Sequence, residues 1–180
     1  SFFGWNLETG ANTQRFDAQG NYGDMAVTSD GTRGVTSSRS NKKRGKFFNV
    51  YVWNLTTRKL IHTLENHTTR LTCLNVSADG KRIFSGSPNQ LNVWDLESGK
   101  LLHTYKEQIG DLRQLALSRD GKRALNSAIR NKQLDIKVWD LTNHKLLHSL
   151  KGHERDIACL AVSPNGVQAV SGGADQTLRL

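Results

Sequence analysis

The sequence predicts an all-β protein built from repeated antiparallel sheets of four strands. Three observations lead to this prediction. Four tryptophans, at positions 5, 53, 94 and 139, stand in one local context, of which "VWDLESG" is an example. A polar turn centred on Asp-Gly or Asn-Gly follows each tryptophan after 25 or 26 residues. Short apolar runs fill the chain between these two markers, with almost no helical periodicity.

The two markers hold a common register along the chain. Successive tryptophans are separated by 48, 41 and 45 residues. The turns that follow them are Asp30-Gly31, Asp79-Gly80, Asp120-Gly121 and Asn165-Gly166. Four copies in one register indicate an internal repeat, and a period of about 40–45 residues with a Trp-Asp pair is typical of propeller blades.

Each repeat is expected to supply four strands, which we label a to d. Strand a precedes the Asp-Gly turn and strand b follows it, because Asp-Gly and Asn-Gly provide the positive φ of a tight hairpin. Strand c ends at the tryptophan, and strand d comes after it. After the last tryptophan, strand d is "HKLLHSL", strand a is "IACLAVS" and strand b is "VQAVSGG", and "QTLRL" belongs to a strand c.

This pattern resembles the WD-repeat β-propeller family over essentially the whole chain. The fullest copy is "KGHERDIACLAVSPNGVQAVSGGADQTLRL", which contains the family's Gly-His pair at Gly152-His153. The other copies depart from it. Asn66 precedes His67, Gln108 stands where a histidine is expected, and the segment 18–20 has no histidine.

The order of the strands predicts a segment of a larger ring of about seven blades. The chain reads as strands c and d, three whole blades, and then strands a, b and c. In the family, the strand-c tryptophan comes about six residues after the equivalent of Asp175, which is position 181. Two alternatives remain. One is a closed ring of four blades, since the 17 expected strands are close to the roughly 16 strands that four blades of four strands contain. The other is a ring closed by two copies of the chain. The expected units are the end of one blade in 1–17, blades in 18–65, 66–106 and 107–151, and an incomplete blade in 152–180.

Composition narrows the functional classes. The 180 residues are 36% hydrophobic and 23% charged, as in a folded domain, and contain no apolar run long enough to cross a bilayer. The first residues, "SFFGWNLETG", do not have the pattern expected of a signal peptide. Two cysteines, Cys73 and Cys159, do not form a disulfide framework, so we expect free thiols in an intracellular, cytoplasmic protein. The net charge of +9 favours an acidic protein, nucleic acid or an anionic membrane surface as partner.

One constellation invites comparison with a hydrolase. His153, Ser171 and Asp175 share a repeat, and a Ser-His-Asp set can catalyse acyl transfer. The resemblance to WD repeats implies instead a structural network of His, Ser or Thr, Asp and Trp that joins strands a, b and c. The corresponding set in the 66–106 blade is His67, Ser85, Asn89 and Trp94. We therefore expect no catalytic residue, no metal and no cofactor.

Two further sets recur with the repeat. Cys73 and Cys159 are equivalent to Met25 and Gln114 on strand a, which predicts a core position near the inside of the ring. The histidines of strand d could form a pH sensor or metal site. Blades diverge at the rim, however, so we expect solvated edge residues far apart from one another. These histidines are His62, His103 and His148.

The candidate binding surface is the face of the loops between strands b and c. The first whole blade has about eight extra residues there, including "SNKKRGK", and the third has about four, including "IRNKQ". In the family these loops share a face with those between strands d and a. A solvated loop without a partner is the alternative to a contact surface. The expected contact residues are Arg39, Lys42, Lys43, Arg44, Lys46, Arg70, Asp111, Arg130, Lys132, Glu154, Arg155 and Asp156.

The resemblance implies a non-catalytic protein-interaction module, a scaffold or sensor domain of a larger protein or assembly. Its partners would be proteins, acidic ones in view of the basic loops, and no small-molecule substrate is expected. The alternative is a module that binds nucleic acid or anionic lipid through those loops. Steep salt dependence of binding would favour the alternative.

Overall fold

The computed structural model describes residues 2–5, 8–16, 21–40, 48–106, 109–130 and 133–180. All regular secondary structure in these residues is β-strand, arranged in five antiparallel sheets. The strands are β1 (Phe2–Trp5), β2 (Asn12–Phe16), β3 (Asn21–Val27), β4 (Arg33–Ser40), β5 (Phe48–Asn54), β6 (Lys59–His67), β7 (Cys73–Val76), β8 (Arg82–Ser87), β9 (Gln90–Asp95), β10 (Leu101–Tyr105), β11 (Asp111–Leu117), β12 (Arg123–Arg130), β13 (Gln133–Asp140), β14 (Lys145–Lys151), β15 (Ile157–Val162), β16 (Ala169–Gly173) and β17 (Leu178–Arg179).

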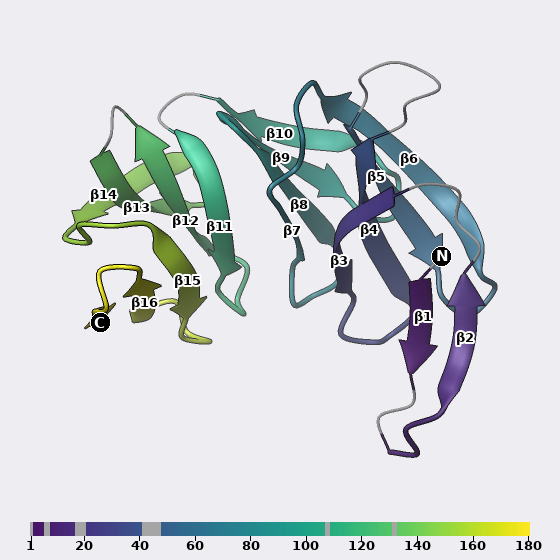
Figure 1. Cartoon of the computed structure of the whole chain (residues 1–180). Coiled ribbons are helices and arrows are strands. Elements are labelled where there is room, and N and C mark those ends of the chain that lie inside the picture. The colour runs from purple at the N-terminus through teal and green to yellow at the C-terminus, as the bar shows by residue number, and fades with distance from the viewer. Residues whose placement is uncertain (1, 6–7, 17–20, 41–47, 107–108, 131–132) are drawn as a thin grey trace.

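Each sheet keeps its strands in the order of the sequence. The sheets are β1-β2, β3 to β6, β7 to β10, β11 to β14, and β15 to β17 (Figure 1). The prediction of strands c and d, three whole blades and strands a, b and c is therefore confirmed. Strand β6 runs to His67, two residues past the boundary expected at 65.

The first strands of successive sheets lie side by side. β3 contacts β7, β7 contacts β11, and β11 contacts β15. Side chains reinforce these contacts: Thr72 Oγ1 donates to the Leu112 carbonyl at 2.8 Å. The sheets fan out from these inner strands as an open arc, with the two chain ends on opposite sides (Figure 1). The alternative of a closed four-bladed ring is therefore not the arrangement of this structure.

A repeated polar motif closes the hairpin between the first and second strands of a sheet. The Ser77 hydroxyl donates to Asp79 Oδ1 at 2.5 Å, and the Lys81 N–H donates to the same oxygen at 3.0 Å. The hydrogen bond from Ser77 is the main reason that the pKa of Asp79 lies below its usual value. Gly80 has φ of 68°, a conformation that glycine adopts without strain. This motif makes each Asp-Gly pair a reliable marker of the a–b hairpin.

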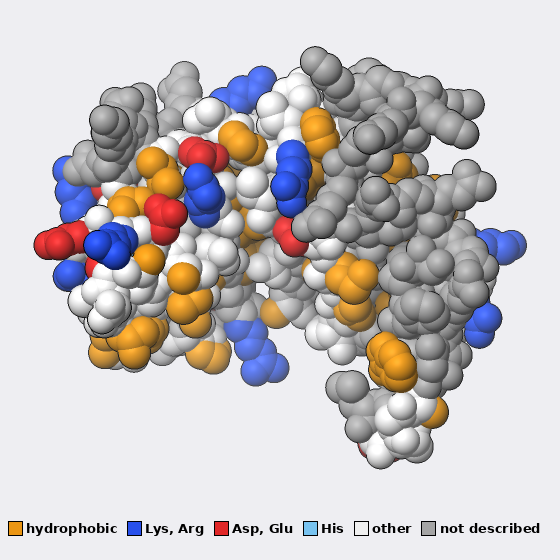
Figure 2. All heavy atoms as spheres, viewed as in Figure 1, with side chains coloured by type: hydrophobic (Ala, Val, Ile, Leu, Met, Phe, Trp, Pro, Cys, Tyr) orange, Lys and Arg blue, Asp and Glu red, His pale blue; other side chains and the backbone are white. Residues whose placement is uncertain are grey.

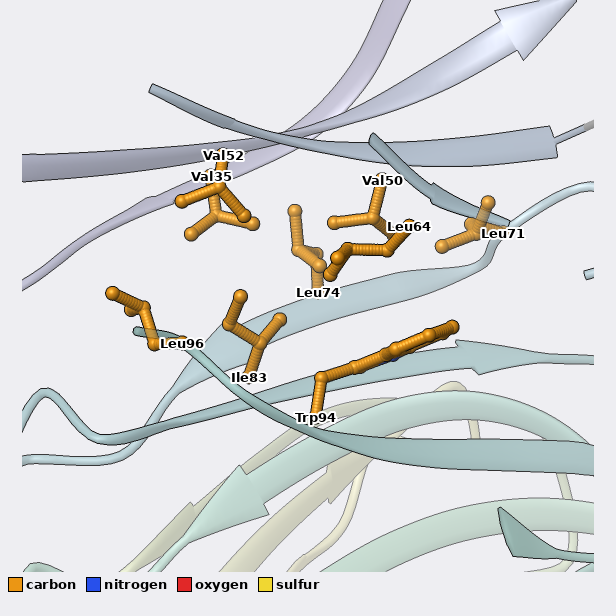
Figure 3. Close-up of a cluster of buried hydrophobic side chains, with 9 residues drawn as sticks. All are labelled: Val35, Val50, Val52, Leu64, Leu71, Leu74, Ile83, Trp94 and Leu96. Carbon is orange, nitrogen blue, oxygen red and sulfur yellow. The ribbon is translucent and has the colours of Figure 1, made fainter. Parts of the chain in front are cut away.

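The core lies between sheets. One cluster joins the β3–β6 sheet to the β7–β10 sheet, and each member is at most 8% exposed (Figure 3). Its members are Val35, Val50, Val52, Leu64, Leu71, Leu74, Ile83, Trp94 and Leu96. A second cluster, which includes Phe84, Tyr105 and Leu112, joins the β7–β10 sheet to the β11–β14 sheet. Each sheet therefore draws stability from its neighbours, as in other repeat proteins.

The strand-c tryptophans occupy these interfaces as expected. Trp53, Trp94 and Trp139 stand near the ends of β5, β9 and β13 and are 8%, 3% and 5% exposed. Trp5, in the two-stranded sheet, is 60% exposed. Burial of the tryptophan therefore depends on a neighbouring sheet that covers it.

The core position predicted for Cys73 and its equivalents on strand a is only partly confirmed. Cys73 is half-buried, and burial raises the pKa of its thiol to about 12. A Cβ at Gly86 would overlap Cys73 Sγ and come within 2.8 Å of Leu112 Cδ2, so the thiol is packed under the next sheet. The expectation is wrong for Cys159, which is exposed, and for Met25, which is 51% exposed. Both cysteines are free thiols.

Candidate functional site: buried histidine networks and the loop face

His67 is the centre of a buried hydrogen-bond network in the β7–β10 sheet. It lies at the end of β6 and is 2% exposed. Its Nε2 is 2.7 Å from Ser85 Oγ and 3.2 Å from Asn92 Nδ2, and its Nδ1 is 2.9 Å from Ser87 Oγ. The indole N–H of Trp94 donates to Ser85 Oγ at 2.8 Å. The network therefore joins the end of one sheet to the second and third strands of the next.

The partners determine the protonation of His67. The Asn92 amide can only donate through Nδ2, so Nε2 accepts hydrogen bonds and the proton is on Nδ1, which donates to Ser87. This is the neutral imidazole. Burial lowers the pKa of His67 to about 4, which keeps the ring neutral at physiological pH.

The structure corrects one member of the expected set. Asn89 is exposed, in the turn between β8 and β9, with φ of 61°. Its backbone N–H donates to the carbonyl of Gly110 at 2.9 Å. The partner of His67 Nδ1 is Ser87, because the tight β8–β9 turn leaves position 89 outside the sheet interface. Ser87 is followed by proline in the sequence, and nothing in its spacing singles it out.

His153 has a similar arrangement with a carboxylate partner. Its Nε2 is 2.8 Å from Ser171 Oγ, and its Nδ1 is 2.8 Å from Asp175 Oδ2. Burial opposes ionisation of Asp175, but hydrogen bonds from Thr177, the Glu154 backbone N–H and His153 outweigh it and hold the pKa of Asp175 well below its usual value. The carboxylate is therefore a permanent acceptor for the imidazole N–H.

The Ser171–His153–Asp175 geometry is the same as that of a hydrolase triad, but its setting differs. Ser171 is 4% exposed and lies in the middle of β16, where it pairs with Leu160 and Arg179 on both flanking strands. A nucleophilic serine needs an exposed hydroxyl on a sharp turn or comparable position. The hydroxyl of Ser171 joins β16 to His153 in the connection before β15.

The remaining sheets use residues that the sequence reasoning missed. Trp53 Nε1 donates to Thr36 Oγ1 at 3.0 Å, and Trp139 Nε1 donates to Asn126 Oδ1 at 2.7 Å. Asn126 also donates to the carbonyl of Ile109 at 3.3 Å. A signal for these residues existed, since each tryptophan partner is five positions after the turn glycine. The four residues at this offset are Thr36, Ser85, Asn126 and Ser171.

The second candidate site is at the starts of the inner strands, and we call it the loop face. Among the described residues it comprises Arg70, Asp111, Arg113, Glu154, Arg155 and Asp156. Arg70, Glu154, Arg155 and Asp156 are exposed in the connections before β7 and β15, and Asp111 begins β11. Sequence reasoning omitted Arg113, which extends from β11 and pairs with Asp111 at 3.4 Å.

Arg113 connects two shallow pockets on the loop face. It lines one pocket together with Asp24, Ser37 and Arg70, where three neighbouring sheets meet. It also lines a second pocket together with Ile129, Leu134 and Asp156, at the next junction. The structure therefore brings Arg70, Arg113 and Asp156 onto one continuous surface across three sheets.

The structure does not describe the side chains of the other expected contact residues. Lys42, Lys43, Arg44, Lys46 and Lys132 lie outside the described residues. Arg39 and Arg130 are the last or next-to-last residues of β4 and β12, and their side chains are also outside the description. The expected basic loop cluster therefore stays a prediction.

The strand-d histidines correct another expectation. His62 is half-buried, and its Nε2 is 2.8 Å from the carbonyl of Glu97 in the next sheet. His103 stacks on His144 of the following sheet, with ring centroids 3.9 Å apart. These two rings are junction residues, because strand d of one sheet packs on the turn between strands c and d of the next. His148 is exposed, as expected.

The radial sheets, adjacent inner strands and buried tryptophan networks define a segment of a β-propeller. Residues 58–95 and 144–180 match the family model described as WD domain, G-beta repeat. The first segment spans β6 to β9 and the second spans β14 to β17, so each runs from a strand d to a strand c. Both segments are WD repeats, and the resemblance predicted from the sequence is confirmed. No curated protein matches the chain.

WD repeats typically mediate protein–protein interactions or scaffolding, and domains built from them are generally non-catalytic. The described part of the chain contains no helix long and apolar enough to cross a membrane.

Proposed function

We propose that the chain is a non-catalytic protein-interaction module, a scaffold or sensor domain that binds a protein partner through the loop face. The observation on which the proposal rests is the position of Arg113 between two pockets whose linings come from four sheets. Arginine is enriched where proteins bind one another, because its planar guanidinium pairs with carboxylates in fixed geometry. We further propose an intracellular, cytoplasmic setting, in keeping with two free thiols.

The distribution of charge favours a protein over a polyanion as the partner. The described loop face combines three arginines with Asp111, Glu154 and Asp156. On the part of the molecule formed by β11 to β16, Figure 2 shows basic, acidic and apolar side chains interspersed. Carboxylates would repel a phosphate backbone, whereas a protein surface can match both signs and the apolar floor that Ile129 and Leu134 supply.

The second candidate function is binding of nucleic acid or anionic lipid through the loops between strands b and c. The sequence "SNKKRGK" supports it. A polyanion that neutralises several of these lysines and arginines would release counterions, so its affinity would fall steeply with salt.

Charge reversal on the loop face should separate these functions. We expect Arg113→Glu to weaken binding of a protein partner by about tenfold or more, because a buried arginine contact at an interface commonly contributes that much. Partners would be captured from cells with the wild-type chain, identified by mass spectrometry, purified and titrated against each variant.

Lys122→Glu is the matched control, since Lys122 is an exposed cation in the hairpin turn between β11 and β12, away from the loop face. It makes the same change in net charge and should alter affinity by less than about twofold. Equal effects of the two substitutions would contradict the proposed surface. Binding of duplex DNA, RNA or phosphatidylserine vesicles with a steep salt slope, unaffected by Arg113→Glu, would support the second function.

A further inference from the structure

Two histidines from different sheets are stacked at the junction between the β7–β10 sheet and the β11–β14 sheet. His103 comes from β10, and His144 comes from the turn between β13 and β14. The ring centroids are 3.9 Å apart and the rings are inclined by 15°. Tyr105, two residues after His103, places its hydroxyl oxygen 2.8 Å from His144 Nδ1 and contacts the ring of Trp139 at 5.1 Å. The stack therefore closes the outer part of a buried aromatic interface.

The preceding junction shows the same packing without a second imidazole. His62 of β6 occupies the position of His103, and Gly99 occupies the position of His144 in the turn. A Cβ at Gly99 would come within 2.9 Å of His62 Cγ, so the ring lies directly on the turn. Gly99 has φ of 68° and His144 has φ of 55°. A non-glycine residue in this conformation is unusual, and here its side chain supplies the partner ring.

The stacked geometry disfavours positive charge on His103. The Tyr105 hydroxyl stays protonated, because burial raises its pKa to about 12, and its oxygen can either donate to His144 Nδ1 or accept from an Nδ1–H. Burial lowers the pKa of His103, and the nearby His144 lowers it further. One protonated ring can stack on a neutral one, but two cations at this distance repel.

Other charged groups around the pair do not remove this repulsion. Lys106, directly after β10, lines the same pocket as the two rings. Arg82 of β8 and Asp140 of β13 act on Tyr105 in opposite directions. Asp140 Oδ2 is also 3.9 Å from Arg123 Nη1 of β12. Among these described groups the cations outnumber the single carboxylate, so a second proton on the histidine pair is poorly compensated.

We propose that this junction is a pH-sensitive joint: the stacked rings of His103 and His144 hold the two sheets together near neutral pH, and positive charge that accumulates on the pair at lower pH loosens them. The direction of the pH effect follows from the linkage between proton binding and opening of the joint. When the joint opens, His103 returns to an ordinary affinity for protons, so the open form binds more protons than the closed form below about pH 6.5. Acidification from about pH 7.5 to 5.5 therefore shifts the joint toward opening. The neighbouring junction at His62 and Gly99 has no such pair to repel.

A double-mutant cycle isolates the pair from every other titrating group. The variants are His103→Gln, His144→Gly and both together, and the readout is amide hydrogen exchange of 139–150 in the full chain. At pH 7.5 we expect a favourable coupling of about threefold in the opening equilibrium, typical of an aromatic pair. At pH 5.5 we expect the coupling to vanish or to change sign. A coupling of the same size at both pH values would overturn the proposal.

A second measurement tests the pair directly. In His144→Gly, the NMR titration midpoint of His103 should rise by about half a unit or more, because the neighbouring charge is removed. Glycine is the native residue at the equivalent Gly10 and Gly99, where φ is 69° and 68°, so the turn should fold normally. His148→Gln is the control and should leave the midpoint unchanged. An unchanged midpoint in a folded His144→Gly protein would also overturn the proposal.

Discussion

Replacing Trp94 with alanine is expected to lower the free energy of unfolding by about 3–5 kcal/mol, as large-to-small substitutions of buried aromatic residues do. Trp94 is 3% exposed and belongs to the hydrophobic cluster between the β3–β6 and β7–β10 sheets. Alanine would leave a cavity between two sheets that depend on each other for burial. It would also remove the indole N–H that donates to Ser85 Oγ at 2.8 Å. The first loss weakens the junction between the two sheets, and the second removes a hydrogen bond within the β7–β10 sheet.

Urea unfolding of the full chain would measure this effect against two matched variants. Trp5→Ala removes a tryptophan that is 60% exposed, so it should change stability by no more than about 0.5 kcal/mol. Trp94→Phe keeps most of the apolar contact but loses the N–H donor, so its cost should fall between the other two. Equal costs for Trp94→Ala and Trp5→Ala would contradict the assignment of Trp94 to the core.

The second large effect is acid destabilisation through His67. Burial lowers the pKa of His67 to about 4 in the folded chain, while an unfolded histidine titrates near 6.5. Because the folded pKa is the lower one, the unfolded chain binds more protons between these values, and stability falls as pH falls from about 6.5 to 4. The loss from this histidine is at most roughly 3 kcal/mol, since each pKa unit corresponds to about 1.4 kcal/mol.

Substitution of His67 would test the source of that acid loss. His67→Ala should cost about 1–3 kcal/mol at pH 7, because Ser85, Ser87 and Asn92 lose a buried partner. It should also flatten the decline of stability between pH 6.5 and 4. His148→Gln, an exposed histidine on β14, should leave both the stability and its pH dependence almost unchanged. A His67→Ala curve parallel to that of the wild type would contradict the buried neutral state.

Much of the fold could be predicted because the repeat depends on interactions between residues that are close together in the sequence. A Ser or Thr two residues before Asp-Gly, with glycine at positive φ, is sufficient to close a hairpin within one short segment. The alternation of these turns with tryptophans therefore predicted the number and order of strands. The burial of Trp53, Trp94 and Trp139 followed from the same register.

The site was predicted less completely, because its contacts depend on loop geometry and on neighbouring sheets. Asn89 had the expected spacing, but the tight β8–β9 turn leaves it exposed and Ser87 takes its place. Arg113 had no recurring neighbour in the sequence, yet the adjacency of β7, β11 and β15 places it between two pockets. Neither result can be read from a spacing alone.

The sequence by itself determined the repeat, the hairpins, the four-stranded order and the tryptophan positions, since each rests on backbone preferences and contacts within about 45 residues. Only the tertiary structure decided how one sheet meets the next. The histidines of strand d recur at one register, yet His62 packs on a glycine and His103 packs on a second imidazole. The physical reason is that the environment of a strand-d side chain is supplied by the turn of the following sheet, about 40 residues away. The sequence pattern of the strand itself therefore does not reveal this environment.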